Sequence, residues 1–203
     1  MHAWFEPALA DNVSRPCLFI GCSDAPPALP GEPASGWSGL IRIVSHGNVV
    51  PPYEAAPQPI AASIAHAVTH RGVRDVVVCG HSRCQALRSL LLPAELAPSE
   101  AQRRWSAHAA STRALLRRHY LHLSGEALWE VALQEHVLVQ IEHLLTHPRL
   151  REAVDKAQVR LHAWLHDEDE SRILAFEPGS GQFETLVIPQ PQRLSERGGL
   201  PRD

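Results

Sequence analysis

Short apolar runs rich in β-branched residues recur along the chain and predict β-strands. The predicted strands cover residues 17–20, 40–44, 75–80, 160–166 and 172–177. Residues 17–20 and 76–79 are continuously apolar, which is typical of strands buried on both faces of a sheet. Residues 160–166 alternate between apolar and polar positions, and the acidic residues 167–170 predict a solvated turn leading into an antiparallel partner strand.

Helical periodicity separates these strands. The predicted helices cover residues 60–71, 83–92, 99–120 and 125–147. Glycine or proline ends three of them, at Gly72, Pro93 and Pro148. The remaining helix begins with Ser99 and Gln102, which have the Ser-x-x-Gln form of a capping box. Strands that alternate with helices in this way predict a parallel sheet with right-handed crossovers.

Together these elements predict an α/β fold, with a central, mostly parallel β-sheet flanked by helices and a C-terminal antiparallel strand. At 203 residues the chain is long enough for one domain with a substantial core. We place this single domain at residues 1–189, including a short N-terminal arm over residues 1–16. Residues 190–203 are polar and rich in glycine, proline and arginine, and they predict a mobile tail.

The composition, with 44% hydrophobic and 20% charged residues, is typical of a soluble globular protein. The formal net charge of -3 gives no electrostatic argument for binding nucleic acid. We find no secretory signal at the N-terminus and no apolar stretch near the roughly 20 residues of a membrane span. We therefore expect a cytoplasmic protein without a membrane span, whose four cysteines bind metal or stay reduced.

Two short polar stretches follow the two continuously apolar strands and carry the candidate chemistry. Cys22 and Asp24 come after the first of these strands, and His81 and Cys84 come after the other. Because ligands collect at the carboxyl ends of parallel strands, we expect both stretches to open onto one crevice. Two thiols and an imidazole form a set that zinc binds tetrahedrally. The sequence therefore predicts a zinc site of Cys22, His81 and Cys84, with Asp24 beside it.

This arrangement resembles the β-class carbonic anhydrases, with a Cys-x-Asp motif after one strand and a Gly-His-Ser-x-Cys motif after a later one. Further matches to the family occur in the same order along the chain, at residues 47–52, 62–64, 139–142 and 161–164. The similarity covers nearly the whole chain. It implies a β-carbonic-anhydrase-like domain with Zn²⁺ as its cofactor, bound by Cys22, His81 and Cys84.

The resemblance also implies an activity, the interconversion of CO2 and bicarbonate by a carbonate dehydratase, which is a zinc lyase. Zinc held by three protein ligands leaves a fourth position for water, which becomes a hydroxide able to attack CO2. Asp24 is then a catalytic residue, and His46, Gly47 and Asn48 are candidates for the substrate pocket. As partners, the family implies CO2, bicarbonate or a similar small molecule, and a homodimer or homotetramer.

One departure from the family pattern bears on the state of the zinc. In the family, an arginine two residues after the aspartate holds the carboxylate away from the metal, but Pro26 occupies this position here. Without that partner, Asp24 could become the fourth zinc ligand and close the site. Arg42, Arg83 or a residue of a partner subunit could instead supply the missing guanidinium group.

Three functions follow from these alternatives. The first is a carbonic anhydrase, with reduced activity if nothing replaces the arginine. The second is a catalytically silent homologue in which Asp24 closes the zinc site and the protein serves as a structural or regulatory binding protein. The third is a hydrolase of COS or CS2, as are some relatives of this fold. Fold resemblance does not choose among these functions, because function resides in the site.

Two further pairs of histidines lie four residues apart on predicted helices, His66 with His70 and His143 with His147. This spacing places both rings of a pair on one face of a helix. Neither pair has a third potential ligand nearby in the sequence. We therefore expect these four side chains to face solvent rather than to bind a metal.

Overall fold

The computed structural model describes residues 16–25, 39–93, 96 and 99–186. Within these residues, six strands form one sheet in the order β2-β1-β3-β4-β5-β6. The strands are β1 (Cys17–Cys22), β2 (Leu40–Ser45), β3 (Asp75–His81), β4 (Arg160–Asp167), β5 (Arg172–Glu177) and β6 (Gln182–Leu186). The first four run parallel, and β5 and β6 are added antiparallel. The predicted α/β fold is confirmed, although β6 was not predicted.

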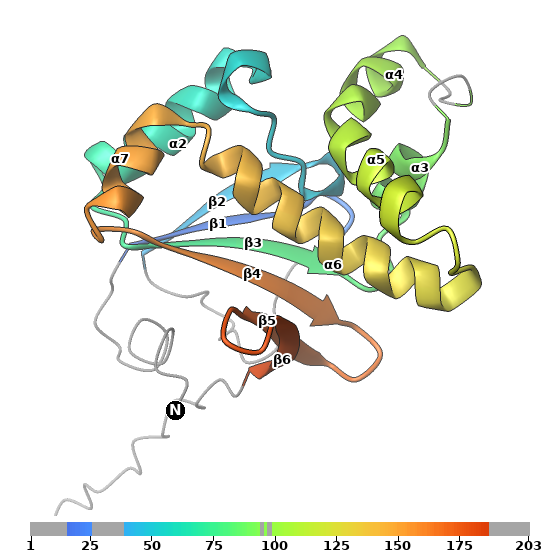
Figure 1. Ribbon diagram of the computed structural model, residues 1–203. Helices are drawn as coiled ribbons and strands as arrows, with labels where there is room; N and C mark the ends of the chain where they lie inside the picture. Colours follow the sequence, from blue (N-terminus) through green and yellow to red (C-terminus); the bar gives the residue numbers. More distant parts are fainter. Residues whose placement is uncertain (1–15, 26–38, 94–95, 97–98, 187–203) are drawn as a thin grey trace, which may run out of the picture.

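The predicted arm, apart from Pro16, and the predicted tail over residues 190–203 lie outside the described residues. The described α-helices are α2 (Gln58–Thr69), α3 (Gln85–Leu91), α4 (Glu100–Ser106), α5 (Ala110–His119), α6 (Gly125–Leu144) and α7 (Pro148–Asp155), and the short 3-10 helices are η1 (His46–Asn48), η2 (Tyr53–Ala55) and η4 (Ala107–Ala109). In Figure 1, α2, α6 and α7 lie over one face of the sheet, whereas α3, α4 and α5 gather near the carboxyl ends of the parallel strands. No helix in the described part of the chain has the length and apolar character needed to cross a membrane.

The two central strands account for the continuously apolar runs, because β1 and β3 are buried along their whole length. Leu18 and Ile20 belong to the main core that includes residues of the covering helices, whereas Phe19 joins a second cluster formed by alternate strand positions. Cys17 and Cys79 lie in that second cluster, and burial raises the pKa of each thiol to about 12. These two cysteines therefore pack as small hydrophobic residues.

The predicted helix over residues 125–147 ends earlier in the structure, at Leu144, and Pro148 begins α7, a helix that was not predicted. This proline follows the turn after α6 and occupies the first turn of α7, where its fixed φ and missing N–H suit the start of a helix. The stretch predicted as helical from Ser99 to Tyr120 contains two helices, α4 and α5, which the 3-10 turn η4 separates. The serine half of the predicted capping box is present, since Ser99 Oγ accepts a hydrogen bond from the Gln102 backbone N–H at 3.2 Å, and Gln102 Oε1 accepts one from the Ser99 hydroxyl at 2.8 Å.

The expectation of solvent-facing side chains is wrong for His143 and His147, which are buried. His143 Nδ1 lies 2.8 Å from the carbonyl oxygen of Val50, and His147 Nε2 lies 3.1 Å from that of Pro51. Burial lowers the pKa of both rings, so each neutral imidazole can donate its single N–H to a carbonyl. These bonds attach the end of α6 to the chain segment that follows η1. The other histidine pair is exposed, as expected.

An ion-pair network around the buried Asp75 side chain lies at the amino end of β3. The Asp75 side chain is 1% exposed, and it accepts hydrogen bonds from Arg160 Nε at 2.9 Å, Arg160 Nη2 at 3.0 Å and His162 Nε2 at 2.9 Å. Burial alone would raise the pKa of Asp75, but the hydrogen bonds from His162 and Arg160 outweigh burial and hold the pKa below its ordinary value. The network therefore holds the first residue of β3 to two residues of β4.

We expect Asp75→Asn to lower the free energy of unfolding by about 2 kcal/mol near pH 7, because charged hydrogen bonds are lost from a buried position. Since the pKa of Asp75 is lower in the folded chain, the stabilisation is complete above the unfolded pKa of about 3.9 and disappears as the pH falls through the folded value. Denaturant unfolding near pH 7 and pH 3 should therefore show a difference between wild type and variant that shrinks in acid.

The matched control is Asp155→Asn, which breaks an exposed pair with Arg151 on α7. This variant should change the free energy of unfolding by less than about 0.5 kcal/mol. A loss for Asp75→Asn that stays equal at both pH values, or that matches the control, would contradict the role assigned to this carboxylate.

Candidate metal centre

Three potential metal ligands meet at the carboxyl end of the sheet. Cys22 is the last residue of β1, His81 is the last residue of β3, and Cys84 directly precedes α3. Their ends lie together because β1 and β3 are parallel neighbours. The ligand atoms of the three residues lie within 4.8 Å of one another, and the two Sγ atoms are 3.6 Å apart. These three residues, the ligand group, are all buried, with exposed fractions of 5%, 2% and 1%.

The first turn of α3 is capped by Asp24 and Cys84. Asp24 Oδ2 accepts hydrogen bonds from the backbone N–H groups of Gln85 and Ala86, at 2.6 and 3.1 Å. Cys84 Sγ accepts one from the backbone N–H of Leu87 at 3.2 Å. N–H groups in a first helical turn lack partners within the helix, and the helix dipole favours negative charge beside them. The Asp24 carboxylate is therefore turned towards α3, and it is not part of the three-residue group.

The sulfur of Cys22 lies among backbone donors. The N–H groups of Asp24 and Gly47 each point at Cys22 Sγ, at 3.3 Å. Gly47 has a φ of 71°, which glycine adopts without strain, and a Cβ at this position would collide with the side chain of Leu90. Glycine at position 47 thus permits the close approach of η1 to α3, the helix that directly follows Cys84.

The ionisation of the Cys22 thiol and that of the Cys84 thiol depend on each other, because the two sulfurs are hydrogen-bonded. The hydrogen bond with Cys84 is the largest cause of the lowered pKa of Cys22, about 4, and His81 and the two backbone donors add to it, whereas burial opposes it. The same hydrogen bond raises the pKa of Cys84. The shared hydrogen bond therefore favours one thiolate and one thiol, and a bound cation would displace the remaining proton.

His81 is held by Glu168, a residue that the sequence analysis did not single out. His81 Nδ1 lies 2.7 Å from Glu168 Oε1, whereas the buried Nε2 has no hydrogen-bond partner among the described residues. Because Nδ1 donates to the carboxylate, Nε2 is the nitrogen that offers a lone pair to a metal once the ring is neutral. Burial lowers the pKa of His81, but Cys22 and Glu168 outweigh burial and raise it. Two cysteine sulfurs and an unpartnered imidazole nitrogen fit the donor set of zinc.

The prediction of a solvated turn over residues 167–170 is wrong at Asp167 and Glu168, whose side chains are 19% and 17% exposed. The register of β3 with β4 places His81 opposite His166, so the residues after β4 come to lie beside His81. The neighbouring Asp169, which the turn exposes, fits the original expectation. Only the order and register of the strands distinguish Glu168 from Asp169, and no local pattern in the acidic run reveals that difference.

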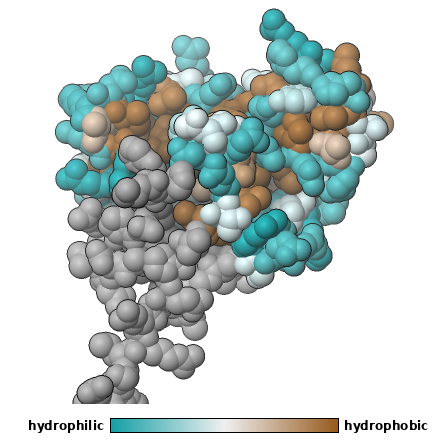
Figure 2. Space-filling model, turned by 60° about the horizontal axis from the view of Figure 1, so that its bottom comes forward, coloured by the Kyte–Doolittle hydropathy of each residue, from teal (hydrophilic) through white to brown (hydrophobic). Residues whose placement is uncertain are grey.

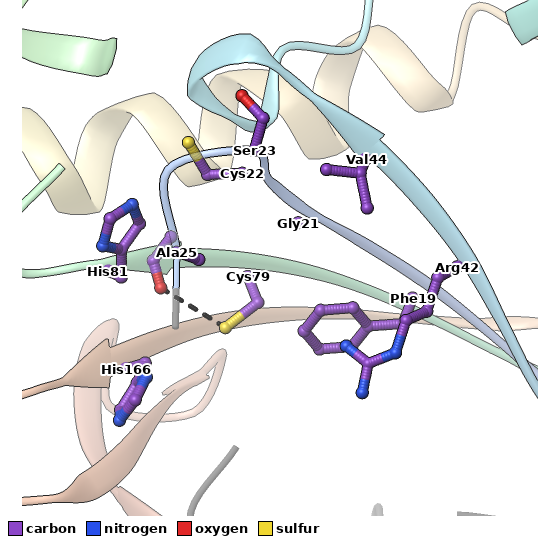
Figure 3. A pocket seen from close by; sticks show the side chains of 11 residues that line it. Phe19, Gly21, Cys22, Ser23, Ala25, Arg42, Val44, Cys79, His81 and His166 are labelled. Carbon is purple, nitrogen blue, oxygen red and sulfur yellow. Dashed lines mark hydrogen bonds between the residues drawn. The ribbon is translucent and has the colours of Figure 1, made fainter. Parts of the chain in front are cut away.

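A cavity of about 220 Å³ adjoins two of the three ligands (Figure 3). The lining residues are Phe19, Gly21, Cys22, Ser23, Ala25, Arg42, Val44, Cys79, Gly80, His81 and His166. In Figure 3, Cys22 and His81 lie on one side of the cavity, and Phe19 and Arg42 lie on the other. The Arg42 guanidinium carbon is 5.2 Å from the centroid of the Phe19 ring. The cavity can therefore hold a small molecule between the ligand group and a positively charged side chain.

The residues predicted for the substrate pocket form η1 and are not among those that line this cavity. His46 Nε2 lies 3.3 Å from Ser89 Oγ, and Gly47 donates its N–H to Cys22 Sγ. Asn48 is 1% exposed, and its Nδ2 has no partner in the part of the chain that the structure describes. Of these three residues, Gly47 is the one that hydrogen-bonds to a member of the ligand group.

The fold and the ligand group define a metal-binding α/β protein with two cysteines and one histidine at the carboxyl ends of parallel strands. A family model described as carbonic anhydrase matches residues 17–173. The chain is 35% identical over 187 residues to the carbonic anhydrase of Pseudomonas aeruginosa, covering 89% of this chain and 81% of that protein. It is 34% identical to the carbonic anhydrase of a Synechocystis species, covering 85% of this chain and 62% of that protein.

Among solved structures, the β-carbonic anhydrase CcaA is similar with a TM-score of 0.77 and 32% identity, covering 85% of this chain and 84% of that one. The chain belongs to the β-class carbonic anhydrase family. Family membership and the ligand group together confirm the predicted cofactor, zinc.

Proposed function

We propose that the protein is a zinc-dependent carbonate dehydratase that interconverts CO2 and bicarbonate. The observation that carries this proposal is the convergence of Cys22, His81 and Cys84 beside a cavity that two of them line. We assign Cys22 Sγ, Cys84 Sγ and His81 Nε2 as the zinc ligands. When bound there, zinc supplies a Lewis acid that makes water a nucleophile near neutral pH.

The position of Asp24 supports an open zinc site rather than one closed by a fourth protein ligand. Its Oδ2 is held by two backbone N–H groups of α3, and no described residue donates to Oδ1. Arg83 forms an ion pair with Asp169. We infer that the helix amides take the place of the arginine that Pro26 replaces, because both supply donors and positive potential to the carboxylate. Oδ1 is then available to accept a hydrogen bond from the nucleophile and to orient it.

The cavity supports the choice of a small substrate. Phe19, Ala25 and Val44 contribute apolar lining, which suits uncharged CO2, and Arg42 contributes positive charge, which suits an anionic product. Cys22 and His81 face the same cavity, so a molecule held there lies next to the assigned ligands.

Stopped-flow CO2 hydration with a pH indicator tests this function, using protein whose zinc content has been measured, over about pH 7 to 9. We expect a rate above the uncatalysed reaction that rises in proportion to the zinc content. The absence of any such rate at one zinc per chain would contradict the proposal. Consumption of COS and CS2 by the same preparations tests the hydrolase alternative.

We also propose that the protein is a homodimer or a homotetramer. Val44 lies on the edge strand β2, is 59% exposed and lines the cavity. On the face of the molecule in Figure 2, hydrophobic residues, drawn in brown, interrupt the hydrophilic surface. A second copy of the chain would remove such residues from water. Light scattering after size exclusion would contradict this proposal if the mass were that of one 22.4 kDa chain.

A cytoplasmic location is part of the same proposal. Cys22 Sγ and Cys84 Sγ lie 3.6 Å apart, so their use as zinc ligands requires a compartment in which thiols stay reduced. Fractionation of cells that produce the protein should place it with the cytoplasmic contents.

A further inference from the structure

We propose that Glu168 is a positioning residue for the metal centre, which tightens zinc binding by holding a negatively charged carboxylate beside His81 Nδ1. This inference rests on the assignment of His81 Nε2 as a zinc ligand. Glu168 contacts the ligand group through a hydrogen bond with His81, in which Oε1 and Nδ1 are 2.7 Å apart. Carboxylates that bond the far nitrogen of a ligating histidine fix its tautomer and make it a stronger donor.

Hydrogen bonds hold both the backbone and the side chain of Glu168 beside His81. Its backbone N–H donates to Ser82 Oγ at 3.1 Å, and the N–H of Ser82 donates to the carbonyl of His166 at 2.9 Å. Its Oε1 also accepts the backbone N–H of Arg83 at 3.1 Å. The turn after β4 is therefore attached to the loop that carries His81 and Cys84. A carboxylate merely passing His81 in a mobile turn would lack these bonds.

The charge of Glu168 has a direct electrostatic effect because the pair is largely shielded from solvent. The side chain of His81 is 2% exposed and that of Glu168 is 17% exposed. Charge-assisted hydrogen bonds are shorter and stronger than neutral ones, and screening by water weakens with burial. The carboxylate therefore supplies a third negative charge near the cation, in addition to the two thiolates, without occupying a coordination position.

Glu168→Gln separates charge from hydrogen bonding. The glutamine oxygen can still accept from His81 Nδ1 and from the Arg83 N–H, but the charge is gone. Competition with a chelator should show zinc binding about tenfold weaker in Glu168→Gln and about 100-fold weaker in Glu168→Ala, which loses the hydrogen bond as well. The matched control is Asp169→Asn in the same turn, which pairs with Arg83 instead, and it should bind zinc as tightly as wild type.

A spectroscopic measurement on the zinc-loaded protein adds a signature that a purely structural role would not change. The proton on His81 Nδ1 should resonate far downfield in wild type, move upfield in Glu168→Gln and vary little in Asp169→Asn, because a neutral acceptor polarises the N–H less. Zinc affinities of both Glu168 variants within about twofold of wild type, or an unmoved resonance, would overturn the proposal. Both readouts are independent of CO2 hydration, so a zinc protein without hydratase activity would refute the proposed function and leave this inference standing.

Discussion

Cys22→Ala is expected to leave less than about a tenth of a zinc ion per chain after dialysis and to reduce CO2 hydration to the uncatalysed rate. The substitution removes one of three assigned ligands and also the sulfur that receives the N–H groups of Asp24 and Gly47. The two remaining ligands, His81 and Cys84, bind zinc too weakly to retain it during dialysis. Metal analysis and stopped-flow hydration on the same sample measure both effects.

Cys17→Ala is the matched control for this experiment. Cys17 is also a buried cysteine of the central strands, but it belongs to the second core cluster, and it is neither in the ligand group nor among the residues that line the cavity. The control should keep its zinc and its activity even if it unfolds more easily. A Cys22→Ala protein that kept one zinc per chain and a normal rate would show that the ligand assignment is wrong.

Asp24→Ala is expected to lower the rate of hydration by about 100-fold, because it removes the carboxylate that orients the nucleophile. The same change removes the acceptor for two N–H groups of α3 and should lower the free energy of unfolding by about 1 kcal/mol. Hydration kinetics and denaturant unfolding measure the two effects separately.

Ser99→Ala controls for the loss of a helix cap, because Ser99 Oγ accepts the N–H of Gln102 at the start of α4. It should show a similar loss of stability with unchanged hydration. If Asp24 instead closes the zinc site, its removal would open a coordination position, and Asp24→Ala would be more active than wild type. Increased activity would therefore contradict the role proposed for Asp24.

The parts of the fold that follow from local pattern were predicted from the sequence. The buried runs before Cys22 and His81 predicted β1 and β3, and the rule that ligands collect at carboxyl ends of parallel strands brought the two half-sites together. The helix N-cap at Ser99 was predicted from a similarly short motif. These predictions depend on hydrophobic periodicity and on short motifs, and both can be read from a single continuous segment of the sequence.

The contacts that the sequence did not predict depend on how distant segments are placed. Glu168 differs from its acidic neighbours only because the register of β4 with β3 brings it to His81. His143 and His147 are buried against the segment after η1, which offers the carbonyls of Val50 and Pro51. The partner of Asp24 was sought among arginines, whereas the structure supplies the first turn of α3. None of these partners is near in sequence to the residue that it contacts.

The coordination of zinc in the loaded protein is the measurement that tests the open site most directly. A crystal structure of the zinc-loaded protein near neutral pH should show Cys22 Sγ, Cys84 Sγ and His81 Nε2 at about 2.0 to 2.3 Å from the metal. Asp24 Oδ2 should remain bonded to the N–H groups of Gln85 and Ala86, so that no protein atom fills the fourth position. An Asp24 oxygen coordinated to zinc, with these two N–H groups released, would contradict the account.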